Sequence, residues 1–232
     1  MVNRQDSIWL EAERIEELKK AKPFMELMMY NRCAIQEVET KLRVLDEEFS
    51  VLADRNPIQG IKSRIKKPIS IIEKLQRRGF DVTLENMQEQ LTDIAGVRVI
   101  CSFVEDIYKM AEMLTSQDDI RIFQVKDYIK NPKPNGYRSL HLIVEVPIFL
   151  SDGKKYMKVE VQFRTIAMDF WASLEHQLKY KKKIDNPEQI ATELKKCADV
   201  ISEVDIRMQD IRYMIDEVQK KHDEGDGGGI LV

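Results

Sequence analysis

The strongest constraint in this 232-residue sequence is a pair of apolar stripes, one toward each end, that repeat about every 3.5 residues. The first runs from Phe24 to Leu52 and is interrupted by a polar side chain only at Asn31, and the second runs from Ile190 to Val218. This spacing predicts two long helices, because side chains three and four residues apart share one helix face. The stripes either pack on a core or on each other, or they form an oligomer interface in which Asn31 fixes the register.

Between the two stripes the pattern changes from helical to mixed. Asn56-Pro57 and Gly60 interrupt the first helical region, and a glycine at position 79 is placed to end the next helix. Runs of β-branched residues indicate strands, and a segment with two prolines and a glycine must be a loop. We therefore expect a helix over 58–78, a strand over 97–103, a helix over 104–114, a strand over 120–129 and a loop over 131–136.

A hairpin follows, with its turn at Ser151-Asp152-Gly153-Lys154. Its first strand places Leu140, Leu142, Val144 and Val146 on one face. Its second strand alternates strictly, with Val159, Val161 and Phe163 on one face and Lys158, Glu160, Gln162 and Arg164 on the other. Such alternation predicts one buried and one polar face. With a turn centred on Asp152-Gly153, His141 lies roughly opposite Arg164 on the polar face, and a helix over 166–180 comes next.

The composition is that of a globular protein and excludes several function classes. Lys and Arg number 37 against 40 Asp and Glu, a net charge of −3, so a general affinity for DNA or RNA is not expected and any anion site must be local. Three separated cysteines and three scattered histidines provide neither a disulfide framework nor a zinc pattern. We see no signal peptide and no apolar run long enough to span a membrane, so we expect a cytoplasmic protein.

Two carboxylates are candidate metal ligands. Glu160 lies on the polar strand face beside Gln162 and, across the hairpin, His141, whereas Asp93 comes shortly before the strand that carries Arg98. Carboxylates among cations suit a divalent metal that holds phosphates. The alternatives are a solvated sheet face for Glu160 and a helix or turn cap for Asp93.

Two basic segments are candidate nucleotide sites. If 58–78 is a helix, Arg64, Lys67, Ser70 and Lys74 fall on one face and could clamp a triphosphate; a solvated basic face is the alternative. In the loop that leads into the next strand, Tyr137 could stack on a base while Lys133, Arg138 and His141 hold phosphates. The alternative for that loop is an ordinary surface turn with a packing tyrosine.

Four motifs occur in one order: DIAGVR at 93–98, NGYRSLH at 135–141, EVQFRT at 160–165 and FWASLEH at 170–176. Together they resemble the synthetase domain of the RelA/SpoT family, the (p)ppGpp synthetases. The length resembles the stand-alone small alarmone synthetases of that family, and residues 56–58 with 62–64 resemble the RelP-type branch more than the RelQ-type branch. On this resemblance we expect a helical region over 1–55, a catalytic domain over 56–183, a helix over 184–223 and a flexible tail over 224–232.

The resemblance implies an α+β fold related to the nucleotidyltransferases, a mixed sheet flanked by helices with long helices at both ends. It implies a GTP pyrophosphokinase, an ATP:GTP 3′-diphosphotransferase, in which the 3′-hydroxyl of GDP or GTP attacks the β-phosphate of ATP and AMP leaves. It further implies Mg²⁺ as cofactor and a homotetramer. No DNA or membrane partner is implied, and regulation by RNA is not indicated.

The resemblance also assigns roles to individual residues. Asp93 and Glu160 would bind the metal, and Glu160 would orient or deprotonate the 3′-hydroxyl. The donor ATP would be held by Arg64, Lys66, Ser70, Lys74 and Arg98. The acceptor GDP or GTP would be held by Lys126, Lys133, Tyr137, Arg138, His141 and Gln162. Lys62 and Asp169 depart from residues common in relatives, which puts stimulation by pppGpp in doubt. Lys126 stands where relatives carry an arginine, so its phosphate contact would be less directional.

Two other functions fit parts of the sequence. A relative with the same chemistry could use an adenine nucleotide or a tRNA end as acceptor, because a tyrosine stacks on any purine. A non-catalytic RNA-binding or helical scaffold protein would be expected to lack the carboxylates or to carry a strongly basic surface, whereas this sequence has Asp93, Glu160 and a net charge of −3.

Overall fold

The computed structural model describes residues 21–180 and 187–226. Within them a five-stranded mixed sheet has the order β1-β2-β5-β4-β3, in which β2 and β5 are parallel and the other neighbours are antiparallel. This confirms the predicted fold class. The strands are β1 (Ile58–Ile65), β2 (Ala95–Cys101), β3 (Arg121–Asp127), β4 (Leu140–Leu150) and β5 (Gly153–Thr165). The helices are α2 (Lys22–Leu52), α3 (Pro68–Arg77), α4 (Leu84–Gln90), α5 (Val104–Thr115), α6 (Ile166–Tyr180) and α7 (Pro187–Asp226).

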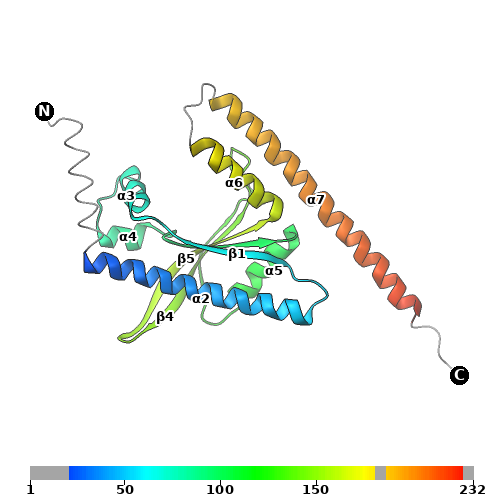
Figure 1. Ribbon diagram of the computed structural model, residues 1–232, viewed down its shortest axis with the longest axis horizontal. Helices are drawn as coiled ribbons and strands as arrows, with labels where there is room; N and C mark the ends of the chain where they lie inside the picture. The colour runs from blue at the N-terminus through cyan, green and yellow to red at the C-terminus, as the bar shows by residue number, and fades with distance from the viewer. Residues whose placement is uncertain (1–20, 181–186, 227–232) are drawn as a thin grey trace.

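One face of the sheet is covered by α2 and α5 and forms the main core (Figure 1). The alternation of β5 puts Val159, Val161 and Phe163 into this core, where all three are fully buried. The first stripe supplies Ile35, Val38 and Leu42 from α2, but its last residues emerge from the core and Leu52 is exposed. The predicted apolar faces of the hairpin and of α2 are therefore confirmed, and burial on this face leaves the opposite face for polar side chains.

A smaller apolar cluster joins the start of α2 to α3 and α4. Phe24 and Leu27 of α2 contact Ile71 and Leu75 of α3 and Met87 of α4 in this cluster. The cluster fixes α3 at one end of the sheet, and α3 carries Ser70 and Lys74.

The helix predicted over 58–78 is wrong in its first half. Residues 58–65 form strand β1, which pairs antiparallel with β2, and the helix begins only at Pro68. Lys67 is extended, as expected for a residue before proline, and Pro68 is the first residue of the helix. The end of the helix is as predicted, because Gly79 has φ +78° and the amide of Phe80 donates to the carbonyl of Leu75.

The hairpin register differs from the prediction by two residues. Its turn lies at Ser151-Asp152, so that His141 is opposite Gln162 rather than Arg164. Because side chains alternate with a period of two, a shift of two residues keeps His141 on the predicted polar face. The strands, helices and loop predicted over 97–180 otherwise lie close to their observed bounds.

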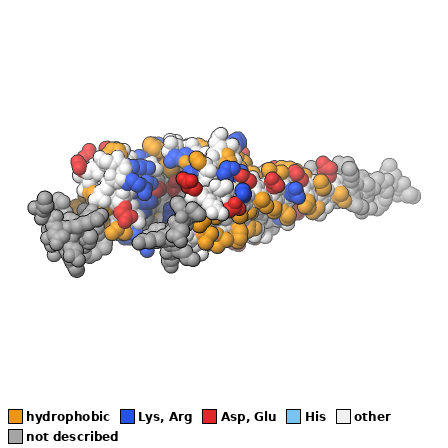
Figure 2. Space-filling view, turned by 90° about the horizontal axis from the view of Figure 1, so that it is seen from above, with side chains coloured by type: hydrophobic (Ala, Val, Ile, Leu, Met, Phe, Trp, Pro, Cys, Tyr) orange, Lys and Arg blue, Asp and Glu red, His pale blue; other side chains and the backbone are white. Residues whose placement is uncertain are grey.

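The second stripe lies on α7, but α7 does not bury it against the rest of the chain. Instead Ala198, Asp205 and Gln209 are buried, whereas Met208, Ile211, Ile215 and Val218 of the stripe are about half exposed. The helix packs against α6 and α5 and then extends past the sheet (Figure 1). Hydrophobic side chains follow its exposed length (Figure 2). The helix ends at Asp226, three residues past the expected end, and the rest of the predicted tail lies outside the described residues, as does 1–20.

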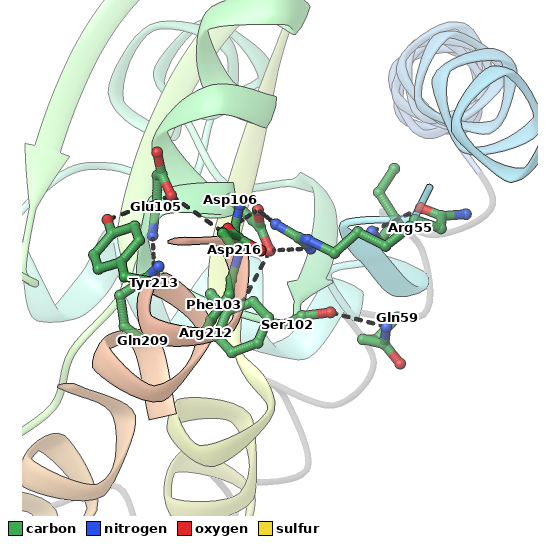
Figure 3. Close-up of polar contacts among 12 residues, drawn as sticks. Arg55, Gln59, Ser102, Phe103, Glu105, Asp106, Gln209, Arg212, Tyr213 and Asp216 are labelled. Atoms are coloured by element: carbon green, nitrogen blue, oxygen red, sulfur yellow. Dashed lines mark hydrogen bonds and ion pairs between the residues drawn. The ribbon is translucent and has the colours of Figure 1, made fainter. Parts of the chain in front are cut away.

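Polar contacts join α5 to α7 and to the connection between α2 and β1 (Figure 3). Both carboxylate oxygens of Asp106 accept hydrogen bonds from Arg55. Arg212 of α7 donates to Glu105 over 3.1 Å, and the backbone amide of Glu105 donates to Gln209 over 3.2 Å. No helix among the described residues is long and apolar enough to cross a membrane.

Candidate active site

The sheet face opposite α2 gathers most of the predicted site residues. Register places Arg64 beside Gly96, Gly96 beside Glu160, and Arg98 beside Gln162. On the far side of β5, His141 is paired with Gln162, and Lys126 is paired with His141. Because directly paired residues point to the same face, all five strands contribute to one polar surface. The residues of that surface are Arg64, Arg98, Lys126, His141, Glu160, Gln162 and Arg164.

Asp93 lies just before β2, with its carboxylate held by two lysines. Lys66 Nζ donates to Asp93 Oδ2 over 2.9 Å, and Lys74 Nζ donates to the same oxygen over 2.5 Å. Burial alone would raise the pKa of Asp93, but the two lysines outweigh it, so the pKa lies below the usual value. Burial lowers the pKa of Lys74. Asp93 Oδ1 is buried without a hydrogen-bond partner, which leaves one carboxylate oxygen available to a ligand.

Glu160, on β5, is held by its neighbours on the same face. Gln162 Nε2 donates to Glu160 Oε2 over 2.7 Å, and His141 Nδ1 lies 3.2 Å from Glu160 Oε1. Burial would raise the pKa of Glu160 and the charge of Asp93 opposes ionisation too, yet the bonds from His141 and Gln162 bring the net pKa below the usual value. The two carboxylates are thus close enough to interact, and both are ionised at neutral pH.

A chain of hydrogen bonds runs from Glu160 to Arg164. His141 Nε2 lies 2.7 Å from the hydroxyl of Tyr137, and Arg164 Nη2 donates to that hydroxyl over 2.8 Å. A carboxylate only accepts, so the proton of His141 lies on Nδ1, and the Tyr137 hydroxyl donates to Nε2. Burial, the largest effect, lowers the pKa of His141 below 6.5 despite Glu160, which agrees with a neutral imidazole.

The ring of Tyr137 lies between two cations. Lys133 Nζ is 5.0 Å and the Arg164 guanidinium carbon 5.2 Å from its centroid. The ring also meets Tyr128 at 6.0 Å in an edge-to-face arrangement. The loop that carries it is anchored on α7, because Gly136 has φ +87° and a Cβ there would come within 2.6 Å of the Cβ of Ala198. A flat ring flanked by cations suits a base with attached phosphates.

A pocket of about 210 Å³ opens on the same face beside β1 and β2. Arg64, Arg98 and Gln162 line it, and its floor includes Gly96. A Cβ on Gly96 would lie 3.6 Å from Arg64 Cγ, in ordinary contact, so the arginine lies directly over the glycine. Two guanidinium groups beside a pocket provide flat, weakly hydrated surfaces that suit a purine ring.

The structure separates two predicted residues from this group and adds one that the resemblance named only as a departure from relatives and not as a site residue. Arg138 points to α7, where it donates to the carbonyl of Ala198 and to Asp199, so it is not brought together with the others. Lys67 is the N-cap residue of α3 and lies outside strand β1, so it does not share a helix face with Arg64. Ser70 lies in the first turn of α3. The added residue is Asp169 of α6, a buried carboxylate that accepts from both Arg98 and Arg164.

The donor atoms suit a hard divalent cation in part. Among residues 21–180 and 187–226, no group of three or more His, Cys, Asp and Glu side chains could hold a metal ion. Mg²⁺, however, is usually bound by one or two carboxylates together with water and substrate phosphates. The unpartnered Oδ1 of Asp93 and the ionised Glu160 fit that pattern.

Comparison with known proteins gives consistent results. The model of the "Region found in RelA / SpoT proteins" matches residues 63–185. GTP pyrophosphokinase YwaC of Bacillus subtilis is 47% identical over 191 residues, which cover 82% of this chain and 90% of the relative. Small alarmone synthetase 1 of B. subtilis, bound to its product pppGpp, superposes with a TM-score of 0.78 at 35% identity, over 84% of this chain and 99% of that one. Small alarmone synthetase 2 of B. subtilis superposes with a TM-score of 0.75 at 44% identity, over 83% of this chain and 100% of that one.

Proposed function

Because this chain belongs to the RelA/SpoT family, we propose that it is a GTP pyrophosphokinase. It transfers the β,γ-pyrophosphate of ATP to the 3′-hydroxyl of GDP or GTP, giving ppGpp or pppGpp, and releases AMP. The observation that carries this function is the position of Glu160. Its carboxylate is held by Gln162, which lines the arginine pocket, and by His141, which meets the hydroxyl of Tyr137, and the charge of Asp93 acts on it.

On the donor side, the arginines of the pocket would hold adenine and the lysines near Asp93 would hold phosphates. Arg64 and Arg98 line the pocket from neighbouring strands. Lys66 and Lys74 meet at Asp93, and Ser70 lies between them in sequence, in the first turn of α3. The single carboxylate of Asp93 pairs with both lysines and leaves a net positive charge, which triphosphate oxygens would meet.

On the acceptor side, Tyr137 would stack on guanine. Lys133, beside the ring, and Lys126, paired with His141, would meet the acceptor's phosphates. Gln162 and His141 hold Glu160 from two sides and so fix the direction in which its carboxylate points. Arg138 is excluded from our assignment because its guanidinium bonds to α7.

Mg²⁺ would be held by Asp93 and Glu160, and it would supply charge neutralisation for the two polyphosphates when bound. The residues of the chain then perform the positioning. The oxygen of the 3′-hydroxyl forms a bond to the β-phosphorus of ATP while the bond from that phosphorus to the α–β bridging oxygen breaks, so the oxygen leaves with AMP. Glu160, ionised at neutral pH, accepts the hydrogen bond of the hydroxyl and takes its proton as the new bond forms.

The experiment that tests this function is product analysis with purified chain. ATP labelled in its β-phosphate is incubated with GDP, GTP or ADP in the presence and absence of Mg²⁺. We expect AMP and a guanosine product that carries the label, in equal amounts, only with Mg²⁺. Product from ADP but none from GDP or GTP would favour an adenine acceptor, and absence of AMP release with every acceptor would contradict the function.

The exposed stripe of α7 supports a second proposal, that the chain forms a homotetramer. Val204, Met208, Ile211, Ile215 and Val218 repeat every three or four residues and are about half exposed. A continuous apolar stripe of this length is typical of helices that pack against another chain. Light scattering after size-exclusion chromatography is expected to give the mass of four chains. The double variant Met208→Glu/Ile215→Glu is expected to lower that mass, and an unchanged mass would place the interface elsewhere.

A further inference from the structure

Asp169, in the first turn of α6, lies where three cations of the sheet meet. Its Oδ1 accepts from Arg98 Nη1 over 2.9 Å and from Arg164 Nη1 over 3.0 Å. The Nζ of Lys62 is 3.6 Å from Oδ2. The side chain of Asp169 is only 10% exposed, so its contacts with the two arginines act with little screening by solvent, whereas the side chain of Lys62 is 65% exposed.

The two arginines lead from Asp169 to different parts of the site. Arg98 lines the pocket beside β1. Arg164 donates hydrogen bonds from its other terminal nitrogen, Nη2, to the hydroxyl of Tyr137 and to Gln162. The hydroxyl of Tyr137 contacts His141, and Gln162 contacts Glu160. A single carboxylate therefore contacts both the arginine that faces the donor and the arginine that holds the ring for the acceptor.

Electrostatics explains why a carboxylate is needed at this point. Burial is the main reason that the pKa of Arg98 is lowered, the charge of Arg164 lowers it further, and Asp169 opposes both. Both guanidinium groups also leave a buried Nε without a partner. Without a negative charge between them, the two arginines would repel each other, and their orientations would no longer be fixed.

We propose that Asp169 is a positioning residue that sets the orientation of Arg98 toward the donor nucleotide and, through Arg164, of Tyr137 toward the acceptor nucleotide. This inference rests on the proposed function, because it assigns the two subsites to ATP and to GDP or GTP. Asp169 acts through its partners and does not itself touch the reacting atoms.

The test compares Asp169→Asn with Asp106→Asn as a matched control. Asp106 is also a buried carboxylate with two arginine partners, Arg55 and Arg212, but it lies in the cluster that holds α7 (Figure 3). KM for ATP, KM for GDP, kcat and the melting temperature are measured for the wild type and both variants. AMP release by the wild-type chain tests the proposed function independently, so the ratio of variant to wild type tests Asp169 alone.

We expect Asp169→Asn to raise both KM values by at least about fivefold, whereas Asp106→Asn lowers the melting temperature but changes either KM by less than about twofold. A double-mutant cycle measures the coupling between Asp169 and Arg98 in the KM for ATP, which a purely structural role of Asp169 would not produce. In the background Arg98→Ala, Asp169→Asn is expected to change the KM for ATP by no more than about twofold, while it still raises the KM for GDP.

Three results would overturn the proposal. The first is that Asp169→Asn lowers the melting temperature with both KM values unchanged, and the second is that only one KM rises. The third is that the double variant raises the KM for ATP by the product of the two single-variant factors, which would show that Arg98 and Asp169 act independently. If Asp169→Asn does not fold, Arg164→Lys decides instead. It is expected to raise the KM for GDP alone, and an unchanged KM for GDP would contradict the proposal.

Discussion

Asp106 and Asp169 are two buried aspartates with the same immediate chemistry and different surroundings. Each meets two arginines, Asp106 on α5 and Asp169 on α6. The arginines of Asp106 both cover the ring of Phe103, with their guanidinium carbons 5.2 Å and 5.3 Å from its centroid. The arginines of Asp169 lead instead to an open pocket and to the hydroxyl of Tyr137.

The surroundings of the cations, rather than the ion pairs themselves, separate a structural centre from a functional one. Around Asp106 both guanidinium groups lie over the ring of Phe103, and one of them, Arg212, belongs to α7, so the cluster fastens α7 to α5 (Figure 3). Around Asp169 the guanidinium of Arg164 lies over the ring of Tyr137, 5.2 Å from its centroid, whereas Arg98 lines an open pocket that a ligand can enter. Substitution of Asp106 should therefore affect mainly stability, and substitution of Asp169 should affect mainly the KM values for the substrates.

The largest effect is expected at the carboxylate that both subsites face. Glu160→Gln keeps the shape of the side chain but removes the charge and the proton acceptor, so kcat should fall by about 10²-fold or more. The melting temperature should remain close to that of the wild type. Glu145→Gln is the matched control, because Glu145 lies on the same sheet face, opposite Lys158, and should retain activity. A Glu160→Gln variant with more than about a tenth of the wild-type rate would contradict the assigned role.

At the structural centre, Asp106→Ala should lower the free energy of unfolding by about 1–3 kcal/mol, because it removes the buried carboxylate that pairs with the half-buried Arg55 and Arg212. Urea unfolding followed by circular dichroism measures the change. The exposed pair Lys196–Glu193 provides the control, and Glu193→Ala should leave stability almost unchanged. Equal and small losses in both variants would show that the Asp106 cluster does not fasten α7.

At the acceptor ring, Tyr137→Ala should weaken GDP binding by about 1–3 kcal/mol, since the stacking surface is lost. Binding of a non-hydrolysable ATP analogue should stay within about twofold of the wild type. Tyr137→Phe separates stacking from the hydroxyl contact with His141, and it should retain GDP binding. If calorimetry shows weaker ATP-analogue binding alone, the ring belongs to the donor subsite.

The smallest effect concerns Asp205 of α7, whose Oδ2 accepts from Thr165 over 2.7 Å. Burial raises the pKa of Asp205 above 3.8, so the folded chain binds this proton more tightly than the unfolded chain. The resulting stability is present below pH 3.8 and is lost as the pH rises through the raised pKa. Asp205→Asn should remove this loss and stabilise the chain at neutral pH. Urea titrations across this range check it, with the exposed Asp210→Asn as control, and an identical pH profile in both variants would count against it.

The local sequence pattern predicted much of the fold. The apolar residues of α2, the hairpin and α6 repeat at the period of a helix or a strand within each element, so no distant contact is needed to recognise them. Strand β1 was missed since Lys62 and Arg64 point into the site, which made a strand resemble a basic helix face. A residue before proline disfavours the helical conformation, so Lys67, which precedes Pro68, could have shown that the helix begins at Pro68.

The candidate site was predictable where its residues follow strand alternation, as Glu160 and Gln162 do, or fall in motifs that resemble the family. Asp169 could not be placed from spacing, because it is 71 residues from Arg98 in sequence and meets it only through the packing of α6. Arg138 lies in a motif beside Tyr137, yet the backbone turn at Gly136 directs it to α7. Whether a side chain faces the site or a neighbouring helix is set by tertiary packing.

The most direct test of this account is a crystal structure of the chain with a non-hydrolysable ATP analogue, GDP and Mg²⁺. We expect adenine between Arg64 and Arg98, guanine against Tyr137, and the 3′-hydroxyl within hydrogen-bonding distance of Glu160. Nucleotides bound elsewhere on the chain, or a 3′-hydroxyl directed away from Glu160 with both subsites filled, would contradict it.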